Sequence, residues 1–282
     1  METHEARAER GTQMILAHRV ELNGEQLDDI DRRIIIKGVE SGAGKMKFTA
    51  QTFGRGIGQR VTSRQRETLD VLVKFSLLID EDDMDARAEL LEEINAWARD
   101  GGWLACENKP GRRIWVECVQ HPGEGDLYEW TTVYTITFRA YAVPYWQDDA
   151  PRRVTASGIL TFQEHIRVDG NTETVMDFSY KNTSGSECNS VTIDTGSVAM
   201  QLTDLGLENN ETLIIGHEEE TGLLYIRIRS AAGIDRSAMA KRRSDAEYQS
   251  ADDLYIQPGK PYVQVLAQRA GNMVISTIGR YL

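Results

Sequence analysis

Hydrophobic and polar positions alternate most regularly between Thr68 and Ile79. Alternation with a period of two is typical of a strand with one buried face. Leu72 and Leu78 make the opposite face partly apolar as well, and a strand that is covered on both sides or lies in a subunit contact has this pattern. The residues of the regular face are Leu69, Val71, Val73, Phe75, Leu77 and Ile79.

An amphipathic helix is predicted after this strand, over Met84–Arg99. Asp82 or Asp83 can accept hydrogen bonds from its first free N–H groups, and Gly101 suits the left-handed conformation that closes a helix. Its apolar stripe at helical spacing consists of Leu90, Leu91, Ile94, Trp97 and Ala98. Two further strands form a predicted hairpin, Trp103–Glu107 and Arg112–Val119.

The rest of the first half is predicted to be β-structure joined by turns. Asn23-Gly24 is a strong hairpin-turn signal. Two glycine-rich stretches, Gly38–Lys47 and Gly54–Arg60, are predicted loops, and the second leads Arg64 and Arg66 into the central strand. The remaining predicted strands are Gln13–Leu22, Ile34–Ile36, Met46–Thr52 and Leu127–Tyr141.

The second half has almost no helical pattern. A polar, proline-bearing linker at 147–153 predicts a boundary between two domains, residues 1–146 and 154–282. Short alternating segments separated by turn residues predict a β-sandwich for the second domain. They are Ile159–Phe162, Ile166–Val168, Glu173–Tyr180, Val191–Ile193, Val198–Leu202, Thr212–Ile215, Leu223–Arg229, Asp253–Ile256, Tyr262–Ala267 and Asn272–Arg280. The predicted class is therefore mainly β, with one helix beside the first domain.

Charge and composition exclude several partners. The net charge is −12, with −8 on residues 1–150 and −4 on residues 151–282, so neither half has the basic excess that drives nucleic-acid binding. No apolar run approaches the roughly 20 residues of a membrane span, and the polar N-terminus lacks the hydrophobic core of a signal peptide. We therefore expect no stable nucleic-acid binding, no membrane partner and a cytoplasmic setting.

No motif nominates a catalytic, cofactor-binding or metal-binding residue. The stretch Gly38–Met46 departs from a phosphate loop, because its first glycine is one residue too far upstream and Met46 replaces the Ser or Thr. His217 with the three glutamates after it is interpreted as an exposed hairpin tip. An odd count of widely spaced cysteines argues against disulfides and zinc and favours reduced thiols that are buried or half-buried: Cys106, Cys118 and Cys188.

Four arginines gather around the second glycine-rich stretch. They can bind phosphates, form salt bridges between subunits or remain solvated, and the acidic balance of this half favours the subunit contact over phosphate binding. With the two leucines of the second strand face they make up the candidate interface: Arg55, Arg60, Arg64, Arg66, Leu72 and Leu78.

The order of these features resembles the distal tail proteins of long-tailed bacteriophages. The resemblance spans most of the chain, from the Val20–Leu27 hairpin through the Arg64–Ile79 strand, with its helix, to the strand ending at Val143–Trp146. It continues in the Pro110–Arg113 hairpin, in Asp252–Lys260 and in the terminal Ile278–Leu282.

The resemblance implies a ring-forming adaptor at the tip of a phage tail, assembled in the bacterial cytoplasm. It implies a first domain related to tail-tube proteins, which forms a hexameric ring with a channel for DNA and tape-measure protein, and a second domain with a galectin-like sandwich. The implied partners are the tail-tube protein, the tail hub and a receptor-binding or tail-fibre protein.

Two other functions stay open. The second domain can capture a host polysaccharide through exposed aromatic residues such as Tyr225 and Tyr255. A hydrolase needs only a converging pair of acids, and no pair is nominated, so we predict that the chain is not an enzyme.

Overall fold

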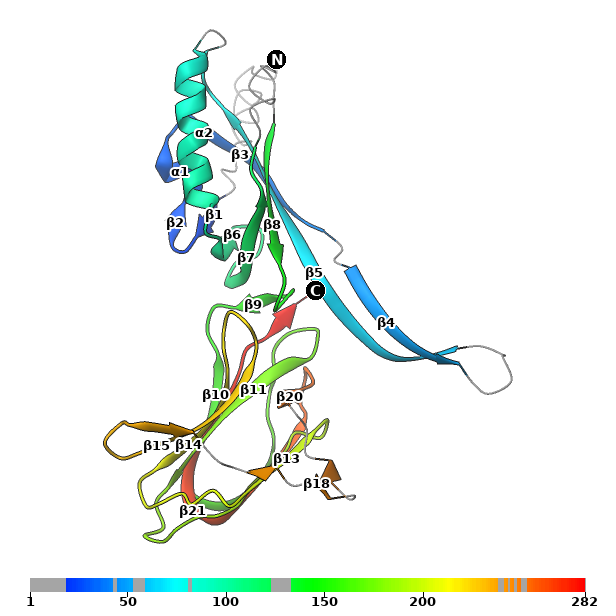
Figure 1. Cartoon of the computed structure of the whole chain (residues 1–282), viewed down its shortest axis with the longest axis vertical. Helices are drawn as coiled ribbons and strands as arrows, with labels where there is room; N and C mark the ends of the chain where they lie inside the picture. The colour runs from blue at the N-terminus through cyan, green and yellow to red at the C-terminus, as the bar shows by residue number, and fades with distance from the viewer. Residues whose placement is uncertain are drawn as a thin grey trace, which may run out of the picture. The chain divides into compact units, whose positions relative to one another are not determined.

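The computed structural model shows a chain built mainly of β-strands, as predicted (Figure 1). Tertiary contacts divide it into two compact units, Met1–Pro144 and Tyr145–Leu282. Within the described part of the chain, no helix is long and apolar enough to cross a membrane. The structure describes residues 19–42, 45–52, 59–80, 83–122, 133–237, 241–242, 244–245, 248–249 and 253–281.

The first unit is one antiparallel sheet with helices on one face. Its strands lie in the order β2-β1-β6-β7-β8-β5-β3, and β4 pairs with β5. The elements, in chain order, are β1 (Val20–Leu22), β2 (Glu25–Gln26), α1 (Leu27–Ile30), β3 (Ile34–Ser41), β4 (Lys45–Thr52), β5 (Gln59–Leu77), α2 (Met84–Ala98), β6 (Gly102–Cys106), β7 (Arg112–Gln120) and β8 (Tyr134–Ala140).

The predicted alternation of β5 is confirmed by the burial of its residues. Leu69, Val71, Val73 and Phe75 are almost completely buried, and Val71 pairs with Phe138 of β8. The α2 helix covers this face, with the Trp97 ring edge-on to Phe138 at 6.2 Å between centroids. The buried residues of α2 include the predicted Leu90, Leu91, Ile94 and Ala98.

Both ends of α2 follow from local chemistry. The Asp83 carboxylate accepts a hydrogen bond from the Ala86 N–H at 3.1 Å, which satisfies one of the free donors of the first turn. Gly101 has φ of +63°, as predicted from its place after the helix. A Cβ at this position would lie 2.3 Å from the Val116 carbonyl oxygen, so only glycine allows β7 to pass this close.

The second unit is all-β and encloses its own core. Its main strands, in chain order, are β9 (Trp146–Asp148), β10 (Arg152–His165), β11 (Thr174–Asn182), β12 (Val191–Asp194), β13 (Ala199–Thr203), β14 (Thr212–His217), β15 (Leu224–Arg229), β20 (Tyr255–Ile256), β21 (Tyr262–Thr277) and β22 (Arg280–Tyr281). The short pieces between β15 and β20 are β16 (Asp235–Ser237), β17 (Lys241–Arg242), β18 (Ser244–Asp245) and β19 (Tyr248–Gln249).

One long strand, β21, joins the two halves of this second sheet. Its residues 264–267 pair with β12, and its residues 271–277 pair with β11. Along its opposite edge, β21 pairs with β10 over both parts. The sequence predicted two strands here, Tyr262–Ala267 and Asn272–Arg280. The structure corrects this to one strand, β21. Its pairing with β10 shifts register between Ala156 and Thr161, which is the pattern of a β-bulge.

Other predicted limits also change. The short helix α1 was not predicted, because four residues are too few for a helical period. β5 begins at Gln59 rather than Thr68. The segment predicted as a linker, 147–153, contains part of β9 and the start of β10. The predicted strand segments at 13–18 and 127–132 lie outside the described residues.

The close approach at Gly101 gives a test of the first unit. Gly101→Ala forces a side chain into a left-handed conformation at a cost of roughly 1–2 kcal/mol. It also creates the clash with Val116, which adds roughly 1–3 kcal/mol. Gly111→Ala is the matched control, since Gly111 has φ of +67° and open space around a new Cβ. Urea unfolding of both variants measures the difference, and equal losses of stability would contradict the packing argument.

Candidate subunit interface

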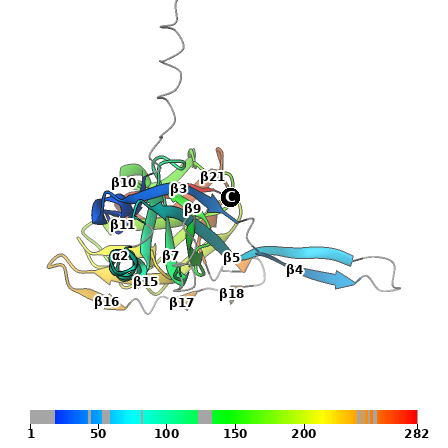
Figure 2. The ribbon, with the colours of Figure 1, turned by 90° about the horizontal axis from the view of Figure 1, so that it is seen from above.

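The β5 strand belongs to the sheet over only part of its length. Residues 69–77 pair with β8 or β3, whereas residues 59–68 pair with β4 alone among the described strands. The split occurs where the Gly42 N–H donates to the Asp70 carbonyl. Figures 1 and 2 show the result, a two-stranded ribbon that leaves the sheet of the first unit. We call residues 45–68 the arm.

The arm differs in charge from the rest of the chain. It contains six Lys and Arg residues and one Glu, a net charge of +5, so the other residues of this −12 chain carry −17. Three of the predicted interface arginines lie within its β5 portion: Arg60 pairs with Gln51, Arg64 with Phe48 and Arg66 with Met46. Arg55 lies outside the described residues.

The sequence missed the arm as a unit. The two glycine-rich stretches were predicted as loops, and Met46–Thr52 was predicted as an isolated strand. The segment from Gln59 to Thr68 contains one apolar residue, Val61, and this is too few to predict a strand from alternation.

The face of the first sheet opposite α2 is only partly buried. An ion pair crosses it, in which the Arg139 guanidinium donates to the Asp70 carboxylate, with 2.9 Å between Nη2 and Oδ2. This hydrogen bond, with a second contribution from Tyr141, raises the pKa of Arg139. Leu72 lies in the same face, half-buried and paired with Thr137, so its predicted place on the second face agrees with the register.

Aromatic residues continue this face across the β6–β7 hairpin. Trp103 pairs with Trp115, and their rings meet edge-on at 5.4 Å between centroids. The Arg113 guanidinium lies 4.0 Å from the centre of the Trp103 ring, a cation–π geometry. All three side chains are half-buried. On this part of the face, the two tryptophan rings and the arginine therefore pack against one another.

Leu78 is exposed, whereas Leu72 is half-buried. Leu78 directly follows β5, its side chain is 64% exposed, and its N–H donates to the Arg33 carbonyl. A leucine in this position contributes little to the core of its own unit. Single exposed leucines are common on protein surfaces, so the exposure of Leu78 alone does not mark a subunit contact.

The residues proposed for sugar binding are less open than the sequence suggested. Tyr225 and Tyr255 are both half-buried, and the Arg227 guanidinium lies 4.5 Å from the centre of the Tyr225 ring. Within the described residues, no group of three or more His, Cys, Asp or Glu has an arrangement that could hold a metal. Cys106 and Cys188 are buried free thiols, and Cys118 is a half-buried one.

Comparison with known proteins identifies a shared fold. No protein-family model and no curated protein matches the chain. The structure of SPP1 Dit (gp 19.1), described as a paradigm of the hub adsorption apparatus of phages that infect Gram-positive bacteria, aligns with 94% of this chain and 99% of its own length. The TM-score is 0.61 at 12% sequence identity. The chain therefore has the fold of a phage Dit protein.

Two phage p2 baseplate structures in the activated conformation are also similar. The strontium form covers 93% of this chain and 97% of the matched chain, with a TM-score of 0.43 and 8% identity. The calcium form covers the same shares with a TM-score of 0.42 and 7% identity. The fold assignment rests on the SPP1 protein.

The pairing of the arm generates a stability prediction. A variant in which Asn-Gly replaces residues 48–64 closes a two-residue turn next to the Lys47–Gln65 pair. Because an isolated two-stranded ribbon adds little stability, the free energy of unfolding should stay within about 1 kcal/mol of the parent value. Urea unfolding of the monomer measures it. A large loss would show that the arm supports the core of its own unit.

Proposed function

We propose that the protein is a structural component of a phage tail, a ring-forming adaptor near the tail tip. Its shared fold with SPP1 Dit supports a place among phage tail proteins. The observation that carries the ring is the arm, a long ribbon without a strand neighbour in the described part of its own chain. The function proposed is assembly through surfaces, and no catalytic step is part of it.

The arm has the physical features of a segment that another chain completes. Among the described strands, none pairs with the outer edges of the ribbon, and the free N–H and C=O groups of such edges favour pairing with a further strand. An isolated ribbon is marginally stable in water. A neighbouring copy that packs on the arm supplies the missing contacts.

Charge favours a second copy as that neighbour. The arm carries +5 and the remaining residues carry −17, so an arm is attracted to the body of another copy. A contact between arm and body joins two different surfaces, and head-to-tail contacts of this kind close into rings when the rotation permits. The arginines of the arm, together with Leu72 and Leu78, are the residues that we assign to this contact.

The resemblance to distal tail proteins leads to a more specific proposal for the ring and its partners. A hexameric ring would surround a channel for DNA and tape-measure protein, between the tail-tube protein and the tail hub. The acidic balance of the chain suits a channel through which DNA passes, because few phosphates would be neutralised along the wall. The second unit, as a galectin-like domain, would bind receptor-binding or tail-fibre proteins.

Ring formation is tested directly on the purified full chain. Light scattering coupled to gel filtration should give a mass near six times the 31.7 kDa of one chain, and negative-stain images should show closed rings. The variant with residues 48–64 replaced should remain a folded monomer. A clean monomer of the parent protein at all concentrations would contradict the proposal.

Charge reversal tests the arginines of the arm. Arg64→Glu plus Arg66→Glu should raise the subunit dissociation constant at least about tenfold, because attraction to the acidic body becomes repulsion. Added salt should weaken the parent assembly in the same direction, since salt screens exposed charges. Arg153→Glu plus Arg227→Glu makes the same change in net charge at exposed positions of the second unit and should leave the ring intact. Unchanged ring yield in the arm variant would remove these arginines from the contact.

A further inference from the structure

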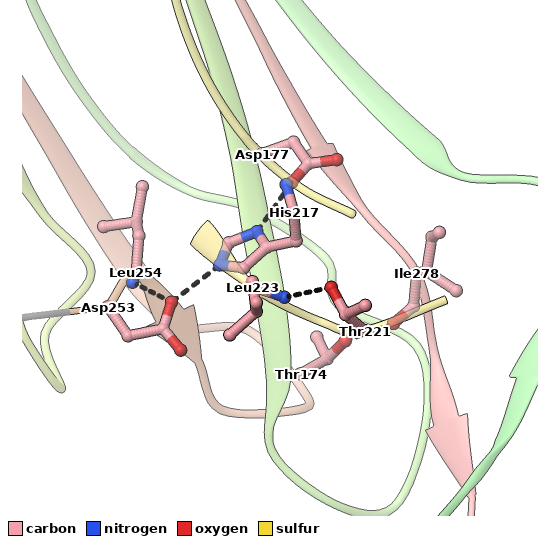
Figure 3. A network of polar contacts seen from close by, with 8 residues as sticks. All are labelled: Thr174, Asp177, His217, Thr221, Leu223, Asp253, Leu254 and Ile278. Carbon is pink, nitrogen blue, oxygen red and sulfur yellow. Dashed lines mark hydrogen bonds and ion pairs between the residues drawn. The ribbon is translucent and has the colours of Figure 1, made fainter. Parts of the chain in front are cut away.

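The second unit contains a histidine whose two ring nitrogens both face carboxylates (Figure 3). His217 is the last residue of β14, and its side chain is only 4% exposed. Its Nδ1 lies 2.8 Å from Oδ1 of Asp177, and its Nε2 lies 2.6 Å from Oδ1 of Asp253. The sequence interpretation of this position as an exposed hairpin tip is therefore wrong for the histidine.

The geometry of the two contacts fixes the protonation of the ring. A neutral imidazole has one N–H donor and one lone pair, so it can donate to only one carboxylate. Both carboxylate oxygens already accept a backbone N–H, from His217 itself to Asp177 at 3.1 Å and from Leu254 to Asp253 at 2.7 Å. They act as acceptors, and a second lone pair facing either one would repel it. With both carboxylates ionised, only an imidazolium satisfies both contacts.

The contacts join three segments that are far apart in sequence. Asp177 belongs to β11, and Asp253 comes just before β20. Among the described residues, three other polar contacts hold the segment 253–256. The Met176 N–H donates to the Leu254 carbonyl at 2.9 Å, the Thr195 hydroxyl donates to the Tyr255 carbonyl at 2.8 Å, and β20 has two residues paired with β11. The side chains of Leu254 and Ile256 are completely buried. The ion pair thus sits where a short segment docks onto a long strand.

We infer that His217 is an imidazolium ion in the folded protein and acts as a proton-dependent latch, which holds the segment 253–256 against β11 and β14. Loss of its proton leaves one of the two aspartates facing a lone pair. Asp177 still accepts the backbone N–H of His217, which keeps β11 and β14 connected, whereas the backbone donor to Asp253 is its own neighbour Leu254. The connection that is weakened is therefore the one between His217 and Asp253. A rise in pH therefore loosens the segment while the rest of the unit stays folded.

The pKa directions agree with this geometry. Burial lowers the pKa of His217, but the hydrogen bonds to Asp177 and Asp253 outweigh it, and the result lies above the ordinary value. For Asp253, burial raises the pKa, and the hydrogen bond and charge of His217 outweigh it, so its pKa is lowered. Other charged groups act on the two aspartates: Arg280 of β22 acts on both, and Glu173 before β11 acts on Asp253. Tyr225 of β15 lies opposite Gly216, the residue before His217.

The direction of the pH effect follows from these shifts. A histidine whose folded pKa is raised contributes stability below its unfolded pKa of about 6.5, and this contribution is lost as pH rises through the folded pKa. The lowered pKa of Asp253 contributes stability above about 3.9, which is lost as pH falls through its folded pKa. The latch is fully closed between these limits.

Nuclear magnetic resonance of the intact protein with ¹⁵N-labelled histidine tests the latch without any substitution. We expect both ring nitrogens of His217 to be protonated at pH 6 and to titrate above 6.5. Asp253→Asn should lower the pKa of His217 by about one unit or more, because one of its two negative partners is lost. A His217 that titrates at or below 6.5, or that has one unprotonated ring nitrogen at pH 6, would overturn the inference.

Hydrogen exchange at the Met176 amide reports the docking of the segment. After correction for intrinsic exchange, its opening equilibrium should rise about tenfold per pH unit between 6.5 and the folded pKa of His217, and then level off. His217→Gln should abolish this slope. His165→Gln is the control, because the His165 ring contacts the Lys260 carbonyl and the Tyr262 ring rather than carboxylates, and it should keep the slope. An identical pH dependence in the parent and His217→Gln would refute the latch.

Discussion

The first unit depends on the burial of one face of β5. The residues from Leu69 to Phe75 alternate between α2 and the partly open face, and a slip of one residue would exchange the two sets. This single alternation fixes the register of β5 against β3 and β8, and through β8 it fixes the rest of the sheet. The position of the ion pair between Asp70 and Arg139 then follows, because these residues are directly opposite in that register.

The same strand creates the feature that we assign to assembly. On the N-terminal side of Thr68 the apolar alternation of β5 is absent. The C-terminal part of β5 is held in the sheet, whereas its N-terminal part pairs only with β4 among the described strands. The open edges of this ribbon favour pairing with another chain. The charge difference between arm and body favours a neighbouring copy in that place.

The second unit depends on contacts between segments that are far apart in the sequence. Its core is formed by strands that meet from distant parts of the chain, and β20 adds only two residues to β11. A charged side chain that is almost completely buried costs free energy unless it is paired and hydrogen-bonded. His217 meets that requirement with two carboxylates, which makes the docking of the segment 253–256 depend on one proton. In the assembly that we propose, the first unit uses surface charge to bind another copy, whereas the second unit uses buried charge for internal order.

Local pattern alone determined the elements with strong periodicity. The alternation of Thr68–Leu77, the apolar stripe of α2, the Asn23-Gly24 turn and the helix end at Gly101 are all set by burial period or by backbone sterics within a few residues. Tertiary structure decided what joins distant residues. His217 meets aspartates that are 40 and 36 positions away, and the two glycine-rich stretches become parts of one arm. Such contacts depend on the topology of the sheets, which a pattern within one segment does not encode.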